Sequence, residues 1–288
     1  MKFCANRFRP NAFNRTAMTL VELIVVMTII AIAISLIIPA VQVVRAAAER
    51  IESINQVKNI LVAVHDFSTE HGGTLPGCSP DSGTTFEDIM NLMDNSIQIF
   101  RPTRDGRHAQ LVGLTVTRNP ADPSYAFYPD ESGLVSGNSS YGFNAVAFSP
   151  NSNVSRSFPD GTSNTIAIAE HYARCAEKSL FSRWIGFQSQ GTRWVGRPAT
   201  FADVESGDVI PVVDRKTHYT IGSIPGKTFQ VAPLPKDCDP MIPQTPHLSG
   251  MITGFMDGSV RPISGLVSPR VFWSAATPAG GEVVDLDW

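Results

Sequence analysis

Glu22 is the side chain of this 288-residue chain whose position most needs a chemical explanation. It stands at the start of an apolar run in which no residue from Leu23 to Ile38 is charged. A carboxylate at the edge of a membrane-length apolar segment is costly unless it stays solvated or pairs with a cation. The sequence therefore leaves two interpretations of Glu22: a carboxylate that remains in contact with interfacial water, or one held by a cationic partner.

A second feature lies near the C-terminus, where the segments 251–256 and 259–263 flank Asp257 and Gly258. An Asp-Gly pair suits the positive φ angles of a type I′ turn, so this region predicts a β-hairpin. Pro262 cannot donate a backbone hydrogen bond. We therefore expect that the second strand lies at a sheet edge, or that the nitrogen of Pro262 points away from the paired strand.

His247 precedes Asp257 by ten positions and stands just ahead of the first predicted strand. We expect its imidazole to bond a loop carbonyl or a carboxylate within a structural hairpin at 247–263. The functional alternative is a contact with export machinery or with a ligand.

Catalysis is not predicted, because the chain has no Gly-x-Ser-x-Gly elbow and no His-Glu-x-x-His helix. His65 and His71 are six residues apart and fall on different helical faces. We therefore predict no catalytic, cofactor-binding or metal-binding residue and expect that the protein is not an enzyme. A structural calcium ion at Asp237–Asp239 or at Asp285–Asp287 stays open, although neither follows the EF-hand pattern.

Two other segments have binding alternatives. Residues 160–164 (Asp-Gly-Thr-Ser-Asn) predict a turn before an apolar strand at 165–169; a phosphate- or sugar-binding loop is the alternative, but no Lys follows in Walker spacing. The aromatic run 181–187 together with Arg193-Trp194 fits two paired core strands, with a carbohydrate-binding platform as the alternative.

The residues around Glu22 predict a membrane-spanning helix. Residues 1–17 contain four basic residues and no acid, which favours a cytoplasmic N-terminus. A helix from Met18 to Ile38 would rise about 31 Å, enough to cross a bilayer. A secretory signal peptide cut near Ala40 and a plain membrane anchor are the alternatives.

The helix is expected to continue beyond the membrane, from about Thr19 to about Phe67. Pro39 should bend it near the outer membrane surface. The apolar residues beyond Pro39 keep a helical spacing, so residues 18–44 are predicted to span the membrane and 45–72 to form an amphipathic continuation. These apolar residues are Ile51, Ile54, Val57, Leu61 and Val64.

The remaining residues, 73–288, predict an exported globular body. Its short apolar runs and many glycines and prolines favour strands and loops over further helices, so the fold class is α+β, a long N-terminal helix on an antiparallel sheet. The full chain has net charge −3; without residues 1–17 it has 19 basic and 26 acidic residues, net −7. Nucleic acid is therefore not an expected partner. Cys78, Cys175 and Cys238 allow at most one internal disulfide, and the sequence does not choose the pair.

Residues Ala17-Met18-Thr19-Leu20-Val21-Glu22 and the apolar run resemble the N-terminal signal of type IV prepilins and type II secretion pseudopilins. The resemblance implies that a prepilin peptidase cleaves after Ala17, where Gly is usual, and methylates the new N-terminus at Met18. It also implies that Glu22 pairs with the amino group of a neighbouring subunit, a heterologous contact that generates a filament. Pro39 falls where many pilins place a helix-bending proline.

Further segments resemble a large bacterial family of prepilin-type proteins named for a His-x9-Asp-Gly motif, here His247, Asp257 and Gly258. The other matching segments are 55–76, 140–144, 160–165 and 280–288. The activity of that family is essentially unassigned. The resemblance implies a structural subunit in the inner membrane, with its body in the periplasm or at the cell surface. Its partners would be the prepilin peptidase, membrane lipid, and like subunits or other pseudopilins. The alternative is a membrane-tethered module that binds, for example, polysaccharide and does not polymerise.

Overall fold

The computed structural model describes residues 18–77, 89, 92–93, 98–102, 109–114, 117–124, 139–149, 151–175, 180–182, 196–197, 200–201, 228–239 and 242–281. By its internal contacts the chain divides into two units, Met1–Ala47 and Ala48–Trp288. Several predictions fall outside the described residues: the leader with Ala17, Cys78, most of the aromatic run 181–187 with Arg193-Trp194, and the acidic pair at Asp285–Asp287.

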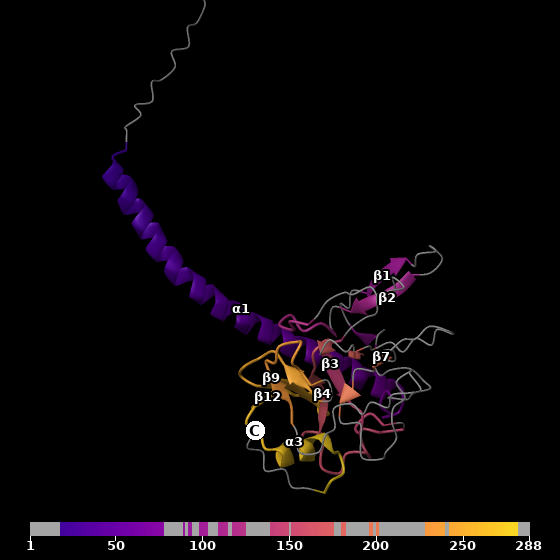
Figure 1. Cartoon of the computed structure of the whole chain (residues 1–288). Helices are drawn as coiled ribbons and strands as arrows, with labels where there is room; N and C mark the ends of the chain where they lie inside the picture. Colours follow the sequence, from indigo (N-terminus) through magenta and orange to yellow (C-terminus); the bar gives the residue numbers. More distant parts are fainter. Residues whose placement is uncertain are drawn as a thin grey trace, which may run out of the picture. The chain divides into compact units, whose positions relative to one another are not determined.

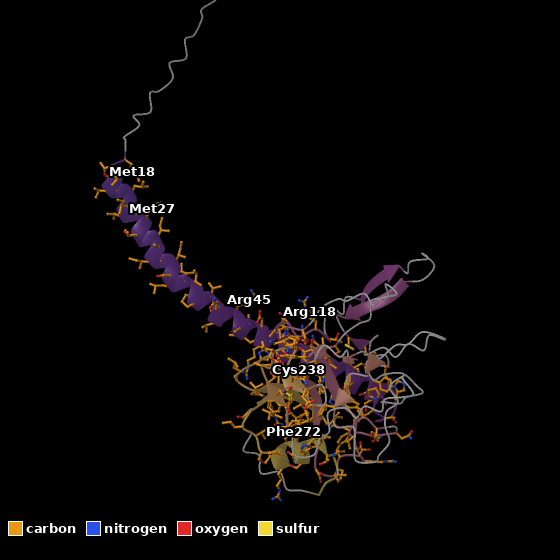
Figure 2. All side chains as sticks on the ribbon, in the orientation of Figure 1. Met18, Met27, Arg45, Arg118, Cys238 and Phe272 are labelled. Carbon is orange, nitrogen blue, oxygen red and sulfur yellow. A yellow bond between two sulfur atoms is a disulfide. The ribbon has the colours of Figure 1, made fainter. Side chains whose placement is uncertain are left out.

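Helix α1 runs from Leu20 to Glu70 as one element of 51 residues, close to the predicted bounds (Figure 1). It continues past Pro39 without interruption, and a bend at that residue stays a prediction. Its most apolar 18-residue window has a mean hydropathy of 2.9 with none of the window buried. Among the described residues, α1 is the one helix long and apolar enough to cross a membrane. Figure 2 shows carbon-rich side chains on α1 around Met18 and Met27.

In the second unit, α1 buries one stripe of side chains at helical spacing. The buried residues are Ser53, Val57, Ile60, Leu61, Ala63, Val64 and Ser68. The predicted stripe was wrong at Ile51, which is 59% exposed. Two residues correspond to about 200° around a helix, so Ile51 and Ser53 lie on nearly opposite faces. The face that packs on the body is the one that carries the polar Ser53.

The main sheet of the second unit has five strands in the order β12-β11-β4-β3-β8. The first four are antiparallel, and β8 pairs in parallel with β3. Their bounds are β12 Val260–Ile263, β11 Met251–Phe255, β4 Ile166–Glu170, β3 Tyr141–Asn144 and β8 Thr200–Phe201. This architecture agrees with the predicted α+β class.

Three small sheets accompany the main one. Strands β1 and β2 are antiparallel, β9 and β10 are parallel, and β6 lies between β5 and β7. Their bounds are β1 Gln98–Pro102, β2 Ala109–Leu114, β5 Arg174–Cys175, β6 Leu180–Ser182, β7 Gly196–Arg197, β9 Gln230–Val231 and β10 Gln244–Thr245.

The main sheet is covered on both faces, by the second part of α1 on one and by helix α3 (Pro269–Ala276) on the other (Figure 1). Alternate residues of β11 face the two layers: Ile252 belongs to the α1 cluster, and Met251 to the α3 cluster. Gly254 lets α1 approach β11, since a Cβ there would lie 2.7 Å from Leu61 Cδ1 and 2.8 Å from Val57 Cγ1.

Helix α3 corrects the expectation that the body would hold strands and loops without further helices. Ser268 caps it by accepting a hydrogen bond from the Val271 N–H at 3.3 Å, and Pro269 occupies its first turn. The helix buries Phe272, Ala275 and Ala276. An eight-residue helix shows too few turns for its periodicity to stand out, but the Ser-Pro start signal was readable.

Candidate functional site

Glu170, the last residue of β4, is a fully buried carboxylate at the centre of a polar network. Its Oε1 accepts hydrogen bonds from Ser53 Oγ at 2.9 Å and Asn119 Nδ2 at 2.7 Å. Its Oε2 accepts from Thr245 Oγ1 at 2.6 Å and from the Ile252 N–H at 2.9 Å. One side chain therefore joins α1, the 117–124 loop, β10 and β11 to β4.

His247 is the fifth neighbour of this carboxylate. Its Nε2 lies 3.2 Å from Glu170 Oε1, within ion-pair distance, and the side chain is 8% exposed. The same Nε2 has no hydrogen-bond partner of acceptable geometry, so we describe the contact as a close electrostatic one and not as an aligned hydrogen bond. The backbone N–H of His247 donates to Thr245 Oγ1 at 3.1 Å, which fixes the residue beside the network.

Tyr141 extends the network towards α1. Its hydroxyl lies 2.9 Å from Ser53 Oγ and donates to Gln56 Oε1 at 2.7 Å. Burial, and next the neighbouring Glu170 carboxylate, raise the pKa of Tyr141 well above its usual value. The phenol therefore stays protonated and acts as a hydrogen-bonding link between helix and sheet.

Asp122 forms a second buried acidic centre. Its Oδ1 accepts from the N–H and hydroxyl of Ser124 at 2.8 and 2.7 Å, and its Oδ2 from Ser140 Oγ at 2.7 Å and the Ala173 N–H at 2.8 Å. Burial raises the pKa of Asp122, although these hydrogen bonds oppose the rise. Like Glu170, this carboxylate ties loop backbone to the strand region around β3 and β4.

The chemistry that this arrangement supports is structural. Each oxygen of Glu170 already accepts two hydrogen bonds, which uses the roughly four acceptor positions of a carboxylate. Within the described ranges, no group of three or more His, Cys, Asp or Glu side chains could hold a metal ion. Because donors from four separate segments converge on Glu170, we assign this carboxylate, with His247 beside it, to the stabilisation of the fold.

The Asp257-Gly258 turn joins β11 and β12 as predicted, but it is not a type I′ turn. Only Gly258 has a positive φ, +82°, whereas type I′ requires two such residues. The Gly258 N–H donates to the Phe255 carbonyl and the Phe255 N–H to the Ser259 carbonyl, both at 2.9 Å. This is a three-residue loop closed by a left-handed glycine. Strand β12, with Pro262, lies at the edge of the sheet, in agreement with the prediction.

The tip of this hairpin is attached to two other segments. Lys58 Nζ, on α1, donates to the Gly258 carbonyl at 2.6 Å. The Asp257 N–H donates to the Thr162 carbonyl at 3.1 Å. Asp257 and Gly258 thus connect the hairpin to the helix and to the 160–164 turn.

The side chain of Asp257 organises the hairpin itself. Its Oδ1 accepts from the N–H and hydroxyl of Ser259 at 2.8 and 2.6 Å, and Arg261 lies 3.4 Å from Oδ2. Partial burial acts to raise the pKa of Asp257, but the Ser259 hydrogen bonds and the Arg261 charge outweigh it and hold the pKa below its usual value.

The 160–164 segment is a turn, as predicted. Gly161 has φ +99°, and its carbonyl accepts from the Asn164 N–H at 3.1 Å. Asn164 Nδ2 donates to the Asp160 carbonyl at 2.9 Å. The polar side chains of this loop satisfy its own backbone, which is the turn chemistry expected from the sequence.

Glu22 has a partner within the chain. Its Oε2 accepts from the Thr19 N–H at 2.8 Å and from Thr19 Oγ1 at 2.9 Å, and its own N–H donates to Thr19 Oγ1 at 3.3 Å. This reciprocal arrangement is a capping box at the start of α1. The Thr-x-x-Glu spacing was its signal in the sequence, and the prediction missed it.

Cys175 and Cys238 form a disulfide across 63 residues, with their Cα atoms 5.5 Å apart. The disulfide connects β5 to the segment after β9. It is one of the three pairings that the cysteine count had left open. Asp239, which the calcium alternative included, donates its N–H to Gln230 Oε1 at 2.6 Å.

No protein-family model, curated protein or solved structure matches the chain.

Proposed function

We propose that this protein is a pilin-like or pseudopilin-like structural subunit, anchored in the inner membrane by the first part of α1. One observation carries the proposal: α1 is a single helix with two different surfaces. Its side chains are exposed up to Val44 and none from Leu23 to Val44 is charged, whereas from Ser53 onward it buries a stripe in the body. An apolar helix exposed on all sides requires lipid or other apolar helices around it.

The N-terminal residues give the proposal its processing step. A prepilin peptidase would cleave between Ala17 and Met18 and methylate Met18, removing the four basic residues of the leader. Those cations favour a cytoplasmic N-terminus, which leaves the body on the far side of the membrane. The Cys175–Cys238 disulfide supports that placement, since such bonds persist in oxidising compartments.

Assembly would follow from Glu22. In the single chain Thr19 already satisfies its Oε2 through the capping box. In an assembly, the carboxylate would also face the methylated amino group of Met18 in a neighbouring subunit. This contact would set the axial register of helices packed side by side, with the bodies outward.

The experiment that tests the proposal is intact-mass and N-terminal analysis of the protein extracted from bacterial membranes, with and without co-expressed prepilin peptidase. We expect a chain that begins at N-methylated Met18 only when the peptidase is active. As a matched control, Ala17→Gly introduces the residue usual in the family and should raise the processed fraction, while Ala17→Leu should block it. A chain that begins near Ala40 would contradict the proposal and indicate an ordinary secreted protein.

A further inference from the structure

Two stretches of the body that are far apart in the sequence meet at three points. Glu170 accepts a hydrogen bond from Thr245 Oγ1 at 2.6 Å. The Tyr172 N–H donates to Gln244 Oε1 at 3.1 Å. The disulfide makes the third connection. One continuous stretch, residues 170–175, therefore receives all three attachments.

The partner stretch keeps its shape through hydrogen bonds of its own. The Gln230 N–H donates to the Pro243 carbonyl at 2.9 Å. The Ala232 N–H donates to the Thr245 carbonyl at 2.7 Å. We call this stretch the docking loop; it comprises residues 230–239 and 242–247. Because these bonds lie within the loop, its own shape does not require contact with the earlier stretch.

The docking loop supplies two neighbours of the buried Glu170 carboxylate. Besides the Thr245 hydroxyl, it places His247 Nε2 3.2 Å from Glu170 Oε1. The other donors come from outside the loop and are Ser53, Asn119 and the Ile252 N–H. A buried acceptor that loses a donor is costly, so docking of the loop and completion of the Glu170 network are one event.

The disulfide acts on the middle of the docking loop. One end of the loop is attached separately, since Val231 packs against Gly265, and the other end continues through a turn into β11. Cys238 lies between these two ends. It is 5% exposed and Cys175 is 1% exposed, so the docked loop shields the bond from reductants.

We propose that the Cys175–Cys238 disulfide is a redox-sensitive switch that docks the loop. Its formation completes the Glu170 network, whereas the reduced chain keeps a folded main sheet and releases the middle of the loop. The chemical step is thiol–disulfide exchange. The two cysteine thiols give two electrons and two protons to a disulfide oxidant, whose S–S bond breaks as the S–S bond of the protein forms.

The switch lies entirely within the unit Ala48–Trp288, so it does not depend on the proposed membrane anchor. Export of the body, as in the proposed function, would add only the timing, because disulfides form in oxidising compartments. An experiment on the purified protein therefore tests the switch alone.

The test compares two donors to Glu170 in the full chain in detergent micelles, with Cys4 and Cys78 replaced by serine. Thr245→Val removes the donor that the docking loop supplies. Ser53→Ala is the matched control, because it removes a donor that α1 supplies to the same carboxylate. Urea unfolding is measured by tryptophan fluorescence with and without a phosphine reductant.

We expect each substitution to raise the unfolding equilibrium constant about tenfold in the oxidised protein. After reduction, the effect of Thr245→Val should fall to about twofold or less, whereas Ser53→Ala should keep its effect. Hydrogen exchange of the protein without either substitution gives a second measurement. Reduction should speed exchange in peptides of the docking loop at least about tenfold more than in peptides of β11.

An undiminished effect of Thr245→Val after reduction, without extra exchange in the loop, would show that the loop stays docked without the bond. That result would overturn the inference. Loss of both effects, or complete unfolding of the reduced chain, would show that the whole network depends on the bond, which also overturns it. If Thr245→Val does not fold, the exchange measurement decides alone.

Discussion

His247 and Glu170 lie in contact in the folded body, with Nε2 3.2 Å from Oε1, although 77 residues separate them in the chain. This contact gives the histidine of the His-x9-Asp-Gly motif a physical role. The histidine lies beside a buried carboxylate at one end of β11, while Asp257 and Gly258 attach the other end to α1 and to the 160–164 turn. The motif residues therefore hold both ends of one central strand.

Glu170→Gln should destabilise the protein by about 2–4 kcal/mol. Two hydrogen-bond donors face each oxygen of the carboxylate, so the amide NH2 group of glutamine would meet donors wherever it points. The measurement is urea unfolding of the full chain in detergent micelles, followed by tryptophan fluorescence. Glu52→Gln, at an exposed position on α1, is the control and should change little. Equal midpoints for the two variants would refute a structural role for Glu170.

His247→Ala should lower the free energy of unfolding by about 1–3 kcal/mol in the same measurement. The substitution opens a cavity and removes the contact between His247 Nε2 and the Glu170 carboxylate. Since both residues act in one network, the losses from His247→Ala and Glu170→Gln should not add in the double variant. Ser249→Ala, at an exposed position two residues after His247, is the control and should change the unfolding midpoint little. A His247 variant with wild-type stability but no export or assembly would instead favour the contact with export machinery.

Several elements with local signals were predicted, although helix α3 and the capping box of α1 were missed, and roles that depend on tertiary contacts could not be predicted. The bounds of α1, the Asp257-Gly258 hairpin and the edge position of β12 all follow from spacing and turn chemistry. Glu170 could not be assigned a role, because an acid at the end of an apolar strand usually faces solvent. Its donors come from residues 53, 119, 245 and 252, and their convergence is set by the sheet order. Ser53 was missed for a related reason: it interrupts an apolar stripe, and only a buried acceptor accounts for it.

The pH dependence of Asp257 should be visible in the stability difference between the wild type and Asp257→Asn. The folded-state pKa of Asp257 lies below its ordinary value of 3.8. The ionised carboxylate therefore stabilises the folded state above pH 3.8, and this stabilisation is lost as the pH falls through the folded-state pKa. Asparagine keeps an acceptor for Ser259 but loses the charge facing Arg261. Unfolding midpoints from pH 7 down to pH 2 should therefore converge at the acid end. A difference that stays constant over this range would mean that the charge of Asp257 does not contribute.

Removal of the Cys175–Cys238 disulfide by a double serine substitution should cost about 4 kcal/mol in the loop-entropy description, given the 63 residues that it closes. Reduction of the wild type should lower its thermal midpoint in a similar way. Mass spectrometry after alkylation should find both cysteines modified only once the protein is reduced. Modification of both without a reductant would show that the bond does not form.

Glu22→Gln separates the two roles that Glu22 can have. Glutamine at this position of a capping box still accepts from Thr19, so α1 should keep its start and the protein its membrane insertion. A methylated amino group of a neighbouring subunit, however, needs the negative charge. If the proposed assembly contact forms, filament incorporation in a host with a pilus or pseudopilus machinery should fall at least as far for Glu22→Gln as for Glu22→Ala.

The capping role predicts the opposite ranking. Glu22→Ala and Thr19→Val each remove part of the box and should weaken the first turn of α1 by about 1 kcal/mol, whereas Glu22→Gln should resemble the wild type. Hydrogen exchange at the amides of the first turn measures this effect in micelles, without any partner subunit. Normal incorporation of Glu22→Gln together with poor incorporation of Thr19→Val would place the function of Glu22 in the helix start alone. The ion pair between subunits would then have to be abandoned.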